Sequence, residues 1–139
     1  MSRIFLQRNV WYLDIQFNNK RIRKSIKNKQ FITRVFSKKE INQSKKFISK
    51  INYFSKRFAA KESFSKALGT GFRKGLNFKD ISILNDKYGK PHYELNNKLK
   101  KLIYSKFKVK KIKISLSLAD EKKYSIAFSV IHKWLVKAQ

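Results

Sequence analysis

The chain has 139 residues, of which 35 are lysine or arginine and 8 are acidic, so its formal net charge is +27. At 42% hydrophobic and 14% aromatic residues it can bury a core, which excludes global disorder and fits one domain. The lack of cysteine excludes disulfides and thiolate metal sites. No apolar run reaches the roughly 18 residues of a membrane span, and no signal peptide is recognisable. We therefore expect a cytoplasmic protein with no membrane partner.

The large positive charge indicates an anionic partner or substrate. Nucleic acid is the first class to consider. However, the basic residues are mostly lysines, whereas arginine reads phosphates and bases better, and the sequence has no recognisable nucleic-acid motif. An acidic protein, a polyanionic cofactor or a general Lys, Asn, Ile and Phe bias explains the charge equally well.

The first segment with a clear pattern is Val10–Phe17, after an extension at residues 1–9. It is apolar and aromatic and predicts a buried strand, in which Asp14 is the single carboxylate. A carboxylate in such a run either faces water at a sheet edge or is paired or metal-bound. Residues 19–29 then predict a short basic helix anchored by Ile22 and Ile26, with its basic side chains exposed.

A long central helix is predicted over Lys50–Leu68. A capping box at Ser37 and Glu40 begins the preceding helix, which is expected to run to about Ile48. The central helix is expected to be amphipathic and to end at the glycine that follows it.

Glu62 shares one face of the central helix with Ser65 and Lys66, because they are three and four residues further on. Such a group is either an ordinary surface ion pair or a site that holds a metal and a phosphate together.

The remainder of the chain predicts a glycine-rich basic loop, a β-hairpin, a helix and two strands. The loop at residues 69–75 lacks the G-K-[ST] ending of a P-loop. His92 and His132 have no partner at metal-binding spacing. The expected elements cover residues 80–84 and 90–95 for the hairpin, 96–105 for the helix, 111–119 and 124–131 for the strands, and 132–139 for a tail.

Three motifs carry a resemblance to a known family: RFAAKESFSKALGTGFRKG from Arg57, NDKYGKP from Asn85 and KISLSLAD from Lys113. They resemble the signatures of the holo-acyl-carrier-protein synthases, the small bacterial phosphopantetheinyl transferases. The similarity runs from about Asp14 to about Ile131. It implies one domain over residues 1–139 with the α+β fold of the 4′-phosphopantetheinyl transferases, a small antiparallel sheet packed with a long central helix.

The resemblance also implies a reaction and its residues. A serine of apo acyl carrier protein would attack the β-phosphorus of coenzyme A, take up the 4′-phosphopantetheine arm and release adenosine 3′,5′-bisphosphate. Asp14 and Glu62 would bind Mg²⁺, and Glu62 and Lys66 would be catalytic. By the same residue-by-residue match, the coenzyme A pocket would be lined by Lys61, Ser65, Lys90, Pro91 and Lys113.

The implied partners are an acidic acyl carrier protein, which would dock on the basic helix at residues 19–29, and two further copies of the chain in a homotrimer. The implied role is in fatty acid and lipid synthesis. The sequence departs from the family pattern where Val10 and Tyr12 replace glycines and where Lys113 and Leu118 replace histidines. These departures leave open a degenerate transferase that binds without turnover. A second alternative, from the lysines and aromatic residues, is a basic nucleic-acid-binding protein.

Overall fold

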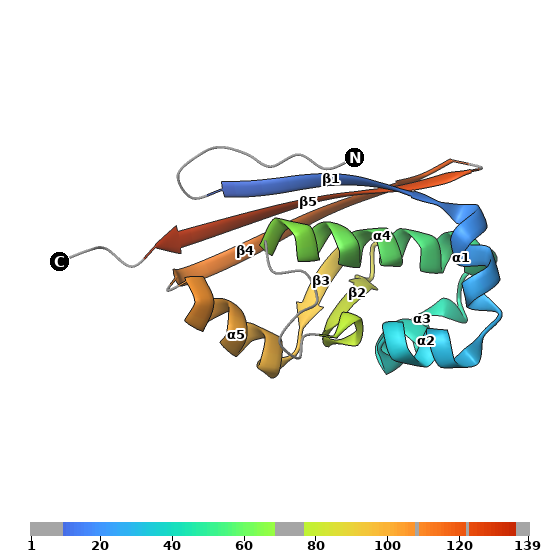
Figure 1. Cartoon of the computed structure of the whole chain (residues 1–139), viewed down its shortest axis with the longest axis horizontal. Helices are drawn as coiled ribbons and strands as arrows, with labels where there is room; N and C mark the ends of the chain where they lie inside the picture. The colour runs from blue at the N-terminus through green and yellow to red at the C-terminus, as the bar shows by residue number, and fades with distance from the viewer. Residues whose placement is uncertain (1–9, 69–76, 108, 122, 136–139) are drawn as a thin grey trace.

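The computed structural model of the chain describes residues 10–68, 77–107, 109–121 and 123–135. Its fold is α+β, as predicted: a three-stranded antiparallel sheet lies on one side of the long helix α4, and a β-hairpin with smaller helices lies on the other (Figure 1). None of the helices in these ranges combines the length and the apolar character that crossing a bilayer requires.

The three-stranded sheet has the order β1-β5-β4, with β1 spanning Val10–Asn18, β5 Tyr124–Leu135 and β4 Val109–Asp120. Strand β1 is therefore an edge strand. Both β1 and β5 pack against α4. Strand β5 is longer than predicted: residues 132–135, expected to belong to the C-terminal tail, continue the strand and pair with β1 and β4.

Three short helices follow β1: α1 at Asn19–Ile26, α2 at Lys29–Val35 and α3 at Lys38–Ser44. The predicted single helix over residues 19–29 is wrong at its end. The side chain of Asn28 accepts hydrogen bonds from the N–H groups of Gln30 and Phe31, and so begins a new helix there. The capping box of Ser37 and Glu40 is confirmed, but α3 ends at Ser44 and not near Ile48.

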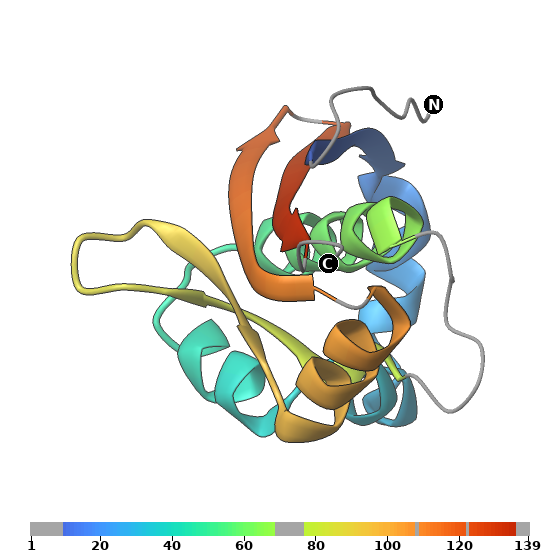
Figure 2. The ribbon, with the colours of Figure 1, turned by 90° about the vertical axis from the view of Figure 1, so that its left-hand side faces the viewer.

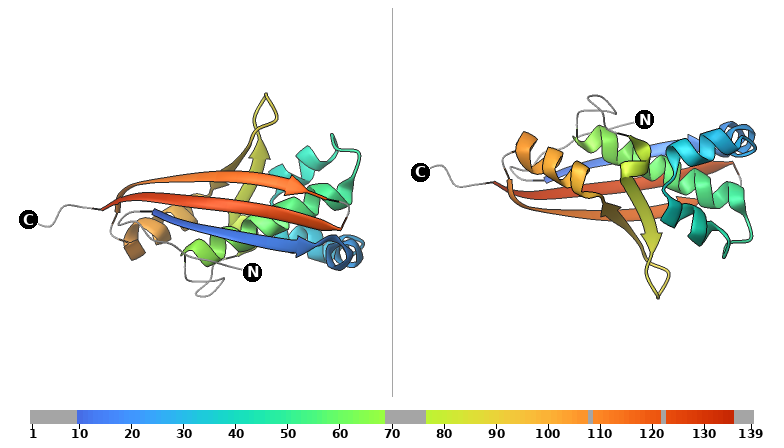
Figure 3. Two further views of the ribbon diagram at one scale, coloured as in Figure 1. Left: turned by 90° about the horizontal axis from the view of Figure 1, so that it is seen from above. Right: turned by 90° about the horizontal axis from the view of Figure 1, so that it is seen from below.

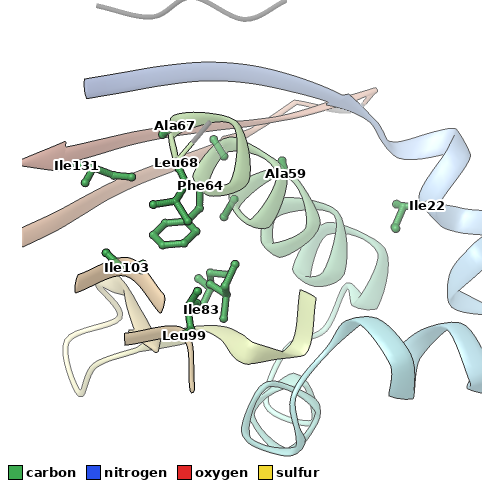
Figure 4. Close-up of a cluster of buried hydrophobic side chains, with 12 residues drawn as sticks. Ile22, Ala59, Phe64, Ala67, Leu68, Ile83, Leu99, Ile103 and Ile131 are labelled. Atoms are coloured by element: carbon green, nitrogen blue, oxygen red, sulfur yellow. The ribbon is translucent and has the colours of Figure 1, made fainter. Parts of the chain in front are cut away.

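Helix α4 spans Lys50–Leu68, as predicted, but it is not amphipathic. It is packed against the sheet on one side and against the hairpin and α5 on the other, so it buries side chains on both of these sides (Figure 4). Phe64 lies at the centre of this core, in a cluster that also contains Ile83, Leu99, Ile103 and Ile131.

The remaining described elements are a 3₁₀ turn at Phe78–Asp80, the hairpin of β2 (Ile81–Asn85) and β3 (Pro91–Leu95), and α5 (Asn97–Phe107). The hairpin turn contains Gly89 at φ 85°, a conformation that favours glycine. The tip of the hairpin extends away from the rest of the molecule (Figures 2 and 3). The predicted extension at 1–9 and the glycine-rich loop at 69–75 lie outside the described residues.

Candidate active site

Helix α4 reaches solvent at two positions along its C-terminal half. Between Ala59 and Leu68 every side chain is buried except those of Glu62, which is half-buried, and Lys66, which is exposed. Because the two are four residues apart, they lie one above the other on the same face of the helix. A carboxylate and an ammonium are thus presented together by an otherwise enclosed helix. Ser65, expected beside them, is buried.

Asp14 lies on β1, where its Cα is paired with that of Phe128 on β5. Its side chain lies outside what the structure describes. Strand β1 packs against α4, so the backbone positions of the two predicted metal ligands are on neighbouring elements. The described residues contain no group of three or more His, Cys, Asp or Glu side chains at metal-binding separation.

Lys61, the neighbour of Glu62, is in the interior and not at a surface that coenzyme A could reach. Its side chain is 0% exposed. The ammonium donates to Glu40 Oε1 at 2.7 Å, to the carbonyl of Phe78 at 2.8 Å and to the carbonyl of Ile81. Burial lowers the pKa of Lys61, while the Glu40 carboxylate raises it. We therefore assign Lys61 a structural role, joining α4 to α3 and β2, and leave it out of the coenzyme A pocket.

A second buried cation, which the sequence did not reveal, lies one turn before Lys61. The Arg57 guanidinium donates to the carbonyl of Ile83 at 3.2 Å and to Asn85 Oδ1 at 2.8 Å, and lies 3.6 Å from the centre of the Tyr53 ring. Burial lowers the pKa of Arg57, and Tyr53 and Glu40 partly offset this effect. Arg57 thus fixes β2, up to the start of the hairpin turn, on α4.

The other predicted coenzyme A ligands are on separate parts of the chain. Lys90 is exposed at the end of the hairpin turn, and Pro91 begins β3. Figure 3 shows that this hairpin protrudes from the molecule. Lys113 is exposed on β4, whereas its neighbours Ile112 and Ile114 pack against the core. Because side chains alternate along a strand, Lys113 faces away from α4. One copy of the chain therefore does not bring Lys113 and the hairpin turn at Lys90 together with Glu62.

Helix α1 presents the basic surface that the sequence predicts. Ile22 is buried in the core and Ile26 is half-buried against it, while Arg23, Lys24 and Lys27 are exposed. Such a surface suits the docking of an acidic partner.

Comparison with known proteins places the chain among relatives of one kind. Residues 13–129 match the 4′-phosphopantetheinyl transferase superfamily. The holo-[acyl-carrier-protein] synthase of Pelagibacter ubique is 54% identical over 83% of this chain and 90% of its own. The holo-[acyl-carrier-protein] synthase of Ehrlichia canis is 46% identical over 78% of this chain and 80% of its own.

Solved structures agree with the sequence relatives. The holo-[acyl-carrier-protein] synthase from Neisseria meningitidis is 32% identical, with a TM-score of 0.74 over 90% of this chain and 98% of that one. The synthase from Bacillus anthracis, solved in complex with CoA (3′,5′-ADP), is 27% identical. Its TM-score is 0.70, over 89% of this chain and 95% of that one.

Proposed function

This chain belongs to the 4′-phosphopantetheinyl transferase superfamily, and we propose that it is an Mg²⁺-dependent enzyme that moves the 4′-phosphopantetheine arm of coenzyme A to a serine of apo acyl carrier protein. The observation that carries the site assignment is the pair Glu62 and Lys66, the two positions between Ala59 and Leu68 at which α4 is not buried. The otherwise buried C-terminal half of this helix thus presents a carboxylate and an ammonium together at its surface, as a site for a metal and a phosphate would require.

The donors suit Mg²⁺, a hard cation that takes oxygen ligands and is commonly held by one or two carboxylates, waters and substrate phosphates. Glu62 would supply one carboxylate from α4, and Asp14 would supply the second from β1, the strand that packs on this helix. Bound there with the pyrophosphate of coenzyme A, the metal would neutralise the charge that repels an incoming nucleophile.

The chain's own residues would then act on the reacting groups. The serine oxygen forms a bond to the β-phosphorus as the bond from that phosphorus to the adenosine bisphosphate oxygen breaks. The Glu62 carboxylate is the candidate to accept the serine proton. Lys66, one turn further along the same face, would place its ammonium against the charge on the transferring phosphoryl group. Lys90, Pro91, Lys113 and Ser65 remain the proposed contacts to the rest of coenzyme A.

The distribution of these residues supports an oligomer with the site between subunits. Lys113 and the hairpin turn that ends at Lys90 lie apart from Glu62 in one copy, so a second copy would have to supply them. The sheet face turned away from α4 carries the exposed Tyr124 and Phe128. A homotrimer built through this face would cover these side chains and complete the site. We further propose a cytoplasmic enzyme of fatty acid synthesis whose acidic carrier protein docks on α1.

The test is to incubate the protein with apo acyl carrier protein, coenzyme A and Mg²⁺ and to measure the intact mass of the carrier. We expect one phosphopantetheine arm to be added, and transfer to fall about 10²- to 10⁴-fold in Glu62→Gln, the usual cost of losing a general base. Chelation of Mg²⁺ should stop the reaction. A wild-type protein that leaves the carrier unchanged and binds duplex DNA or RNA tightly would contradict the proposal.

A further inference from the structure

A chain of three hydroxyl groups, one of them on the residue that follows Glu62, joins α4, β5 and β3. Ser63 Oγ lies 2.8 Å from Ser129 Oγ, and Ser129 Oγ lies 2.5 Å from the Tyr93 hydroxyl. The Tyr93 hydroxyl in turn donates to the carbonyl of Ala60 at 2.8 Å. The chain of hydrogen bonds therefore leaves α4 at residue 63 and returns to it at residue 60.

The direction of these hydrogen bonds follows from counting protons. A carbonyl can only accept, so the one proton of Tyr93 is committed to Ala60. Ser129 must then donate to Tyr93, and Ser63 must donate to Ser129. Each hydroxyl thus has a defined role as donor. Burial also raises the pKa of Tyr93, so the phenol keeps the proton that this arrangement needs.

The two points at which the hydroxyl chain meets α4, Ala60 and Ser63, lie on either side of Glu62 in the sequence. On the opposite flank, the adjacent Lys61 is held by Glu40 on α3 and by carbonyls around β2. The residues immediately before and after Glu62 are therefore both fixed by buried polar contacts to other elements. A helix held on both sides over a single turn cannot rotate about its axis without breaking one of these sets of hydrogen bonds.

We infer that Tyr93, with Ser129 and Ser63, is a positioning residue that sets the rotation of α4 and thereby aims the Glu62 carboxylate. Ser63 and Ser129 are fully buried and the Tyr93 hydroxyl is bonded to the helix backbone, so none of the three would contact substrate. They act through the backbone of α4, much as partners behind a ligand orient the ligand itself. This inference rests on the proposed role of Glu62 as a metal ligand.

The experiment compares two hydroxyl deletions on the full-length protein. Tyr93→Phe keeps the ring and removes the link to Ala60 and Ser129. Tyr53→Phe is the matched control, because the Tyr53 hydroxyl also donates to a backbone carbonyl, that of Glu40, but lies more than two turns before Glu62. Urea unfolding measures the stability of each variant. A Mn²⁺ titration in the presence of coenzyme A, followed by paramagnetic resonance, measures metal affinity apart from activity.

We expect both variants to lose similar stability. Tyr93→Phe should weaken Mn²⁺ binding about tenfold, the lower end of the effect of removing groups that orient a metal ligand. It should also raise the Mg²⁺ concentration needed for half-maximal activity, while KM for the carrier protein stays unchanged. Ser129→Ala should reproduce this pattern if Tyr93→Phe does not fold. Tyr53→Phe should bind Mn²⁺ like wild type.

Two results would overturn the inference. Wild-type Mn²⁺ affinity in Tyr93→Phe and Ser129→Ala, or an equal loss in Tyr53→Phe, would leave the hydroxyl chain with a purely structural role. Glu62→Gln separates this failure from that of the proposed function. If Glu62→Gln loses Mn²⁺ binding and Tyr93→Phe does not, only the positioning role fails. If Glu62→Gln binds Mn²⁺ like wild type, the metal assignment fails and the positioning role fails with it.

Discussion

Replacing Lys61 by methionine tests whether this lysine holds the fold together or binds coenzyme A. Methionine matches the length of the side chain but removes the ammonium. Glu40 would then be a buried carboxylate that keeps its backbone donors, the N–H groups of Ser37 at 3.0 Å and of Ile83 at 3.1 Å, but loses its cation. The carbonyls of Phe78 and Ile81 would each lose a donor as well.

The magnitude follows from these losses. Removing one partner of a buried ion pair typically costs about 3–5 kcal/mol, because the other charge stays buried without compensation. The side chains of Lys61 and Glu40 are both fully buried. The double variant Glu40→Gln with Lys61→Met removes both charges and keeps an oxygen for the backbone donors. It should therefore be more stable than the two single losses predict, with a coupling of roughly 0.5–3 kcal/mol.

The assay is urea unfolding followed by circular dichroism, with steady-state kinetics at a temperature where the variant is folded. Lys66→Met is the control on the same helix. It should change the free energy of unfolding by less than about 0.5 kcal/mol, because Lys66 is exposed, yet it should lose transfer activity. Lys61→Met should show the reverse, lower stability with KM for coenzyme A unchanged. Unchanged stability with a strongly raised KM would refute the structural role and return Lys61 to the coenzyme A pocket.

Three further predictions concern surface charge, alkaline stability and the outer face of the sheet. Arg23→Glu with Lys24→Glu should weaken carrier-protein binding more than coenzyme A binding, and the difference should shrink with salt, because exposed charges are screened over about 10 Å at 0.1 M; equal losses for both ligands would contradict this. Burial raises the pKa of Tyr53 to about 12, so its contribution to stability is complete below pH 10 and is lost as pH rises from 10 toward 12. Tyr53→Phe should therefore lose less stability than wild type between pH 9 and 11 in urea unfolding, and parallel curves would count against the shift. Lys113→Ala should raise KM for coenzyme A in initial-rate kinetics with kcat nearly unchanged, whereas a fall in kcat of orders of magnitude would place Lys113 in the transition state.

The sequence predicted the elements whose signals are local. The bounds of α4, the capping box at Ser37 and Glu40 and the strand that carries Asp14 depend on neighbouring residues, and all three are present. The start of α2 at Asn28 was also a local signal, an N-cap residue, but it was masked by the basic run that continues across it. The periodicity of apolar residues in α4 was misleading, because a helix packed against the sheet on one side and the hairpin and α5 on the other has a solvent face too narrow to produce a clean pattern.

The roles of buried polar residues could not be predicted from local signals. The family match placed Lys61 in the coenzyme A pocket, and only the fold shows that Glu40, 21 residues earlier, is its partner. Likewise, Arg57 is paired with Asn85, 28 residues later. Contacts of this kind depend on which elements pack together. The candidate face of Glu62 and Lys66 was predictable because it needs only the geometry of one helix.

The residues of α1 that pack on the core are different from those that face solvent, so the solvent-facing residues can be replaced separately. This helix reaches the core through Ile22 and Ile26, whereas Arg23 and Lys24, and Lys27 just after the helix, are exposed. With the carrier docked on α1 as proposed, partner choice would be encoded on a short segment that is separable from the chemistry proposed for α4. Grafting the outward residues of α1 from a relative, with Ile22 kept, offers a route to redirect the protein toward other carriers while its interior stays untouched.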